Sequence, residues 1–357
     1  MFDTTRRRVL QGLGISGTAA VAGCTAPGGE SPATEQPQQN AAAQSAQPEV
    51  DRVAADPTDV PDPVDWSEPK HHEVELDVKE VTAEIEPGVT FNYMTFDGRV
   101  PGPMIRVRRG DTISFTLNSP DDSQMPHNVD FHAVYGTGGG AGADAVNPGE
   151  SNGIDFTAKY PGAFIYHCAV PNMDMHISSG MFGMILVEPE DGLPEVDREF
   201  YLGQHEVYTN KDAGEEGHHQ FDMDAMANEE PTYVLFNGEK YPFTPDRYGR
   251  LQAETGESIR VFLVDGGPNV SSNFHPIGNV WTEAYRDGSL GTPEEYVQTL
   301  KVPPGSCMMG EIDTPVPETI KLVDHALSRV VRKGLLAEIE VSGEADEDIF
   351  DPDPGSE

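Results

Sequence analysis

The chain has 357 residues and carries 23 Lys and Arg against 61 Asp and Glu, a formal net charge of −38. This balance excludes nucleic-acid binding, which needs a cationic surface, while the length allows two domains of ordinary size. Concentrated salt, with a Debye length of about 3 Å, would screen the self-repulsion of such a charge. The composition therefore predicts a halophile's protein, with an acidic secreted protein of a mesophile as the alternative.

The N-terminus predicts an export signal over residues 1–23. Three arginines, Arg6 to Arg8, precede an apolar run that is shorter than the roughly 20 residues of a membrane span. The arginines resemble a twin-arginine signal, and "VAGC" resembles a lipobox that would make Cys24 the lipidated first residue of the mature chain. We expect an exported protein on the outer face of the cytoplasmic membrane, held there only by its lipid. A cleaved signal without lipid is the alternative.

Two further segments have the composition of disordered chain. Residues 24–66 are rich in Pro, Gln, Ala and Ser without periodicity, which predicts a flexible tether after the lipidated cysteine. Residues 344–357 predict an acidic disordered tail.

Between these segments the sequence predicts an all-β protein of two tandem β-sandwiches, residues 67–191 and 192–343. Short alternating runs are separated by Gly and Pro turns, a pattern typical of sandwiches. The runs are "EVELDVKEVTAEI", "MIRVRRGDTISFTLNS", "GMFGMILVEP", "REFYLGQHEVYT", "GESIRVFLVDGG" and "LLAEIEVSG". Long amphipathic helices are scarce, and "KLVDHALSRVVRKG" is the clearest short helix candidate.

The stretch "HCAVPNMDMHISSGM" contains three candidate metal ligands, Cys168, His176 and Met181, in the spacing Cys-x7-His-x4-Met. Upstream, "PHNVDFHAV" reads as a strand in which His127 faces one side and His132 the other. Pairing His127 with Cys168 completes two imidazoles, a thiolate and a thioether. This ligand set is typical of a blue-copper electron-transfer centre.

A second site is predicted on the opposite face of the same strands. His132 pairs with His167 there, and Asp130 adds a carboxylate. Two histidines seldom hold copper tightly, so a third ligand must come from elsewhere in the protein. Because His167 and Cys168 are covalent neighbours, an electron would have a short bonded route between the two sites.

These motifs, with "PTYVLFNG", "SNFHPIGNVW" and "VDHALSRVVRKG" in the same order, resemble copper-containing nitrite reductase over most of residues 71–343. The acidity resembles the haloarchaeal members. The resemblance implies two cupredoxin domains, that is, Greek-key β-sandwiches, in each subunit of a homotrimer. It also implies one type 1 and one type 2 copper per subunit, serving nitrite reduction to nitric oxide in denitrification. The electron donor would be a small blue-copper protein or a cytochrome.

The resemblance also implies a role for each site residue. The type 1 ligands would be His127, Cys168, His176 and Met181, and those of type 2 would be His132 and His167 with His325 of a neighbouring subunit. Asp130 and His275 would deliver protons, and Ile277 would crowd bound nitrite. The step from Cys168 to His176 is one residue shorter than is usual in the family.

Two other classes of protein compete with this interpretation. A multicopper oxidase needs several His-x-His pairs, and this chain contains none. A lipid-anchored blue-copper electron carrier would explain the first site but would leave the second group of histidines without a role.

Overall fold

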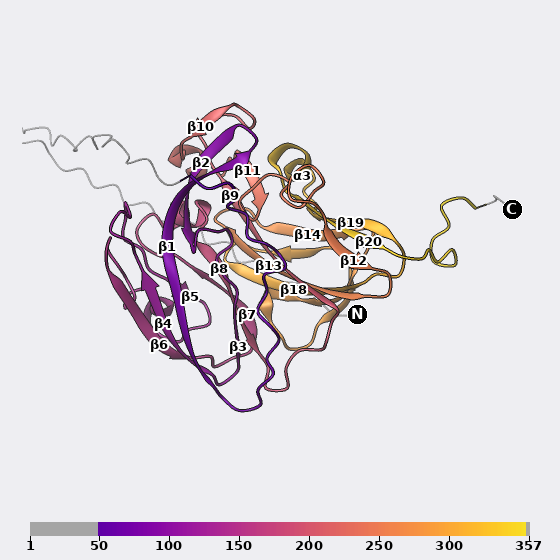
Figure 1. Ribbon diagram of the computed structural model, residues 1–357, viewed down its shortest axis with the longest axis horizontal. Helices are drawn as coiled ribbons and strands as arrows, with labels where there is room; N and C mark the ends of the chain where they lie inside the picture. Colours follow the sequence, from indigo (N-terminus) through magenta and orange to yellow (C-terminus); the bar gives the residue numbers. More distant parts are fainter. Residues whose placement is uncertain (1–48, 355–357) are drawn as a thin grey trace, which may run out of the picture. The chain divides into compact units, whose positions relative to one another are not determined.

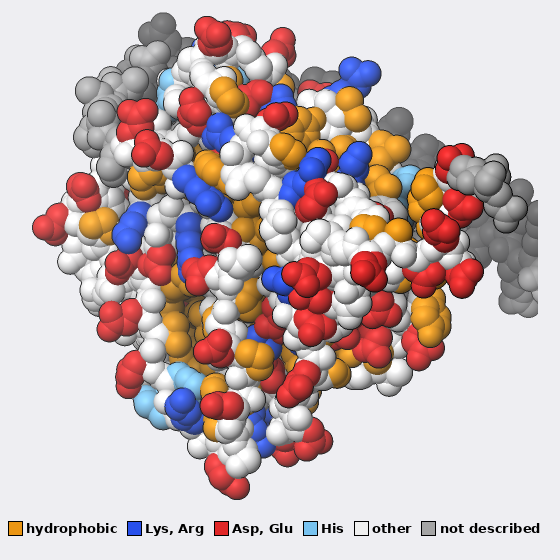
Figure 2. Space-filling view, turned by 45° about the vertical axis from the view of Figure 1, so that its right-hand side comes forward, with side chains coloured by type: hydrophobic (Ala, Val, Ile, Leu, Met, Phe, Trp, Pro, Cys, Tyr) orange, Lys and Arg blue, Asp and Glu red, His pale blue; other side chains and the backbone are white. Residues whose placement is uncertain are grey.

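The computed structural model describes residues 49–354 and places them in four β-sheets joined by short helices and loops (Figure 1). The expected export signal and Cys24 lie outside the described residues. Acidic side chains are spread over the face seen in Figure 2, with Lys and Arg interspersed among them. No helix in residues 49–354 has both the length and the apolar character needed to cross a membrane.

Two sheets come almost entirely from the first half of the chain. The first has the order β10-β2-β1-β4-β6, and the second has the order β3-β8-β7-β5. Their strands are β1 (His71–Glu86), β2 (Val89–Phe96), β3 (Ile105–Arg108), β4 (Thr112–Asn118), β5 (Asp130–Phe131), β6 (Ser151–Thr157), β7 (Gly162–His167), β8 (Phe182–Glu188) and β10 (Gly217–His219). A core that includes Phe115, Phe131 and Ile185 lies between them.

The other two sheets come from the second half of the chain. Their orders are β11-β9-β13-β18-β15-β16 and β12-β20-β19-β14-β17. The strands are β9 (Arg198–Val207), β11 (Tyr233–Phe236), β12 (Leu251–Glu254), β13 (Ser258–Gly267), β14 (Ser272–Ile277), β15 (Trp281–Tyr285), β16 (Glu294–Val297), β17 (Leu300–Val302), β18 (Ser306–Asp313), β19 (Glu318–Asp324) and β20 (Leu336–Ser342). Trp281 and Phe274 lie in their shared core. The all-β sandwich fold is therefore confirmed.

The helices within residues 49–354 are all short. They are η1 (Thr137–Gly140), α1 (Met173–Ser178), α2 (Met223–Ala227), η2 (Arg286–Gly288) and α3 (Ser328–Lys333).

The two pairs of sheets pack against each other through β7 and β8, which lie beside β13 and β18 in Figure 1. Ile185 of β8 belongs to the first core, whereas the neighbouring Met184 belongs, with Phe262 of β13, to a third core between the pairs. Strand β8 is consequently buried along its whole length. This two-sided burial explains why "MILV" is a continuous apolar run and not an alternating one.

Several sequence-based expectations need correction. The expected tether ends earlier than residue 66, because Val53 and Ala54 are buried and their amides donate to the Glu239 carboxylate. The helix candidate "KLVDHALSRVVRKG" begins as strand β19, which is paired on both sides by β14 and β20, and only Ser328–Lys333 is helical. The expected strand over "PHNVDFHAV" contracts to Asp130–Phe131. Residues 344–354 contain no helix or strand.

Candidate metal centres

The end of strand β7 places two neighbouring ligands on opposite sides of one sheet: His167 is its last residue and Cys168 follows it. Tyr166 and Cys168 belong to the core of the first sandwich, whereas Ile165 belongs to the core between the sheet pairs. His167 therefore points away from Cys168, as the alternation of strand side chains requires. One peptide bond separates the two candidate sites.

The first site gathers the ligands that the spacing predicted. The Cys168 Sγ atom lies 3.8 Å from Nδ1 of His127 and 3.5 Å from Nδ1 of His176, and all three side chains are buried. Met181 is fully buried in the same core as Cys168. Its backbone accepts from the Cys168 amide and donates to the His176 carbonyl.

Burial sets the protonation of this site. It raises the pKa of the Cys168 thiol to about 11, and burial together with the nearby His127 lowers the pKa of His176 to about 4. At neutral pH the imidazole of His176 is thus neutral and ready to bind a metal, whereas the thiol needs a cation to displace its proton.

Two residues that support the first site were missed by the sequence analysis. Asn128 accepts from the Ala169 amide at 2.7 Å and donates to the Ala141 carbonyl at 2.8 Å, which ties together three loops around Cys168. Glu80 of β1 lies 3.5 Å from Nε2 of His127. Burial opposes ionisation of Glu80, but hydrogen bonds from His127, Gln124 and Ser123 outweigh it and lower the pKa of Glu80.

The second site forms on the other face. The Nε2 atoms of His132 and His167 lie 3.2 Å apart, and Asp130, the register partner of His167, brings a carboxylate oxygen into the same group. Burial and then the proximity of His167 lower the pKa of His132. A cavity of about 540 Å³ opens on His167; helix α1, the end of strand β13 at Gly266 and the turn at Gly305 also line it.

His275 and His325 are brought together elsewhere on the surface. Their ring centroids lie 5.3 Å apart, with His275 on the outer face of β14 beside the exposed Ile277. His325 follows β19 and is exposed; its amide donates to the Asn273 carbonyl at 2.8 Å. Within residues 49–354, neither histidine joins the group formed by Asp130, His132 and His167.

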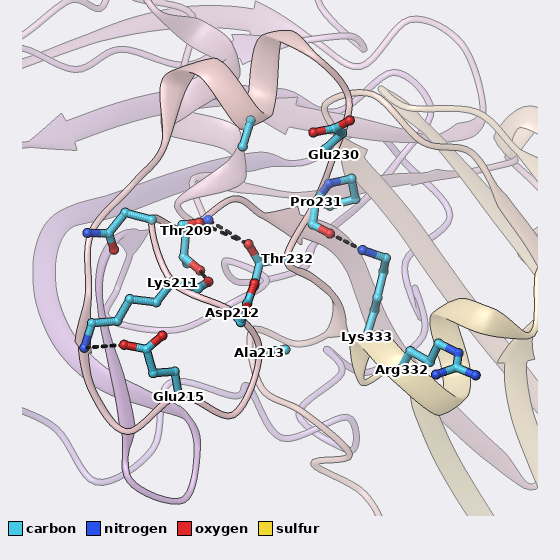
Figure 3. Close-up of a pocket in the computed structure, with 12 residues that line it drawn as sticks. Thr209, Lys211, Asp212, Ala213, Glu215, Glu230, Pro231, Thr232, Arg332 and Lys333 are labelled. Atoms are coloured by element: carbon cyan, nitrogen blue, oxygen red, sulfur yellow. Dashed lines mark hydrogen bonds and ion pairs between the residues drawn. The ribbon is translucent and has the colours of Figure 1, made fainter.

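A larger cavity, of about 560 Å³, is lined by residues that belong to neither centre (Figure 3). Lys211 pairs with Glu215 at its wall, and Lys333 donates to the Pro231 carbonyl. None of its lining residues is His or Cys, so it offers no comparable metal site.

The donor chemistry of both centres fits copper. Two imidazoles and a thiolate with a nearby thioether match a type 1 copper site, and imidazoles with a carboxylate suit a second copper ion. The type 1 ligand set and the histidine cluster of the second centre are thus both present in the folded chain.

Comparisons with known proteins agree with this chemistry. A family model described as multicopper oxidase matches residues 77–192. The copper-containing nitrite reductase of Neisseria meningitidis serogroup B (strain ATCC BAA-335 / MC58) is 42% identical over 303 residues, which cover 85% of this chain and 77% of that protein. The copper-containing nitrite reductase of Alcaligenes faecalis is 32% identical over 282 residues, covering 74% of each. The solved structure of copper nitrite reductase from Nitrosomonas europaea has a TM-score of 0.70 at 34% identity, covering 77% of this chain and 95% of that one.

Proposed function

We propose that this chain, which belongs to the family of copper-containing nitrite reductases, reduces nitrite by one electron to nitric oxide and water, consuming two protons. The adjacency of His167 and Cys168 supports this reaction most directly, because it joins a buried electron-transfer site to a second, more accessible one. A nitrite-to-nitric-oxide assay on the copper-loaded protein tests it. Absence of nitric oxide from a protein that holds both coppers would exclude the reaction.

The ligand assignments follow from the two clusters. His127, Cys168, His176 and Met181 would hold the type 1 copper, and His132 and His167 would supply two of the type 2 ligands. Bound copper would cycle between two oxidation states and offset the charge of an anionic substrate. The chain's own contribution is to fix the donor atoms and to connect them by the bonded path from Cys168 to His167.

Asp130 is the proposed proton donor to a nitrite oxygen. Its carboxylate lies beside both imidazoles of the second site, within 4.8 Å of their ligating atoms. An acid in this position can reach a substrate bound there. We assign the relay of the second proton to His275 and the crowding of nitrite to Ile277.

His325 is proposed to complete the second site of a neighbouring subunit in a homotrimer. Its exposure, beside His275 and the exposed side chains of Ile277 and Leu327, supports a face that meets another copy. A head-to-tail contact repeated three times closes into a ring. In such a ring each first sandwich, residues 67–191, would meet the second sandwich, residues 192–343, of the next subunit.

Mixing two inactive variants tests this arrangement. His325→Ala and His132→Ala should each lose the second copper while keeping the first. Trimers re-formed from both should contain some sites with a full ligand set and regain part of the activity. If mixed trimers stay inactive while each parent trimer re-forms, His325 does not act across subunits.

Counting copper separates the competing functions. A nitrite reductase requires two copper ions per subunit. An electron carrier requires one copper ion, and a multicopper oxidase requires four. The second cluster of His132, His167 and Asp130 favours the reductase over the carrier, since a carrier has no use for it.

Location and working conditions are also proposals. Export with a lipid on Cys24 is supported by the signal-like N-terminus, and Cys24→Ala should release active enzyme from the membrane fraction. The acidic surface supports function in concentrated salt, as in haloarchaea. A small blue-copper protein or a cytochrome is the proposed donor.

A further inference from the structure

Two buried arginines on strand β3 differ in their ion pairing. Arg106 and Arg108 are two residues apart, so their side chains share a face, and both are buried. The Arg106 guanidinium binds Glu188 at 2.5 Å and Glu199 at 2.6 Å. Arg108 forms no ion pair with any residue in the described part of the chain.

The guanidinium of Arg108 is poorly satisfied. The residue is 7% exposed. Among residues 49–354, its buried Nε atom has no hydrogen-bond partner, and Nη1 donates only to the Arg109 carbonyl, at 3.2 Å. A buried charge without a counter-charge is costly. An anion beside this guanidinium would remove that cost.

Asp111, the carboxylate closest in sequence to Arg108, is engaged elsewhere. It is buried and accepts from the Arg108 amide at 2.8 Å and from the Lys70 amide at 2.8 Å. The side chains of Trp66 and His72 also hydrogen-bond to it. With these four hydrogen-bond partners, Asp111 stabilises the loop in which it lies.

Arg108 is one of the residues that line a cavity of about 500 Å³. Arg108, Arg109 and Lys159 line it together with two acids, Glu68 and Glu190. Glu190 lies 3.5 Å from Arg109. Three cations against two anions leave one positive charge without compensation.

We propose that this cavity binds one small planar oxyanion of the carboxylate or nitrate class through the guanidinium of Arg108. A guanidinium forms charge-assisted hydrogen bonds with the oxygens of such an anion, and one negative charge balances the charge of the lining residues. The site is independent of the proposed copper reaction, since none of its lining residues belongs to either metal cluster.

Thermal unfolding of the copper-loaded protein tests the site, with sodium acetate as the probe. Acetate replaces chloride at constant ionic strength, and a ligand of the folded state raises Tm in proportion to ln(1 + [L]/Kd). The Tm of the wild type should rise with acetate concentration and reach a plateau. The His132→Ala variant should show the same rise, which excludes acetate binding at the second metal centre as its cause.

Arg108→Gln should raise the half-saturating acetate concentration by at least about tenfold, because a charge-assisted hydrogen bond is lost. Arg99→Gln, at an arginine paired with Asp59 away from the cavity, is the matched control and should leave the rise unchanged. If Arg108→Gln does not fold, the double variant Arg109→Gln/Lys159→Gln keeps the buried arginine and should still weaken the acetate effect.

Three results would overturn the proposal. In the first, the Tm of the wild type does not rise saturably with acetate. In the second, the Tm of Arg108→Gln rises with acetate as much as that of the wild type. The third is a trimer structure in which a neighbouring subunit's carboxylate already fills the cavity.

Discussion

The Nε2 atom of His127 lies 3.5 Å from Oε1 of Glu80, while Nδ1 of the same ring faces Cys168 Sγ at 3.8 Å. A carboxylate on the far nitrogen of a metal-binding histidine fixes the tautomer and orientation of the ring. Glu80 is itself held by Ser123 Oγ and the Gln124 amide, each at 2.8 Å. The carboxylate therefore secures both the ligand and the loop that precedes it.

Glu80→Gln should raise the reduction potential of the first centre. The substitution keeps the shape but removes a negative charge that favours the more positive, oxidised metal. A tenfold to hundredfold effect, typical for such partners, corresponds to about 60 to 120 mV. Spectroelectrochemical titration of the visible band measures it. Glu75→Gln, at an exposed position of the same strand, is the control, and an unchanged potential in Glu80→Gln would show that the carboxylate only supports the loop.

Copper binding at the first centre should release one proton per subunit at pH 7.5. The raised pKa of Cys168, about 11, means that its thiol carries a proton, whereas the lowered pKa of His176, about 4, means that its ring has none to release. Proton release on adding copper to the metal-free protein is measured in weak buffer. The difference between wild type and Cys168→Ala should equal one, and a difference of zero or two would contradict this protonation scheme.

Asp130→Asn should retain both coppers and lose about 10² to 10⁴-fold in nitrite turnover, the usual contribution of a general acid. Metal analysis and steady-state kinetics on the same preparation separate this effect from loss of metal. Asp155→Asn, at an exposed aspartate of strand β6, should be fully active. Near-normal turnover in Asp130→Asn would remove this residue from proton delivery.

His205 should make the protein less stable in acid. Complete burial lowers the pKa of His205 to about 4, while Nδ1 bonds the Ser178 carbonyl at 2.9 Å. In the unfolded chain the group takes up a proton near pH 6.5, so its contribution is present above that pH and is lost as the pH falls towards 4. Between pH 7 and 4.5 the loss amounts to about 2–3 kcal/mol.

His205→Asn, which preserves a donor to Ser178, should flatten this part of the pH–stability curve. Chemical denaturation at pH 7 and 4.5 measures the effect, with the exposed His71→Asn as the control. An equally steep curve in His205→Asn would mean that other groups cause the acid sensitivity.

The spacing and alternation of residues along the sequence were enough to predict the residues of both metal clusters. The spacing from Cys168 to Met181 and the alternation of side chains on neighbouring strands depend only on the chain near each residue. The same alternation separated His127 from His132, even though regular strand pairing is confined to Asp130–Phe131. Strand β8 lacks the expected alternation of apolar and polar residues, because a strand that is covered on both sides has no polar face.

The class of fold, the ligand set of the first centre, the pair His132 and His167 of the second centre and the bonded link between the centres could therefore all be predicted from local sequence. Groups that are distant in the sequence could be placed beside these sites only from the packing of the sheets. Glu80 is 47 residues from His127 along the chain. Arg106 forms ion pairs with Glu188 and Glu199, whereas Arg108, two residues later, forms no ion pair in the described part of the chain. The physical reason is that backbone periodicity is local, whereas charge pairing and burial depend on how whole sheets pack against one another.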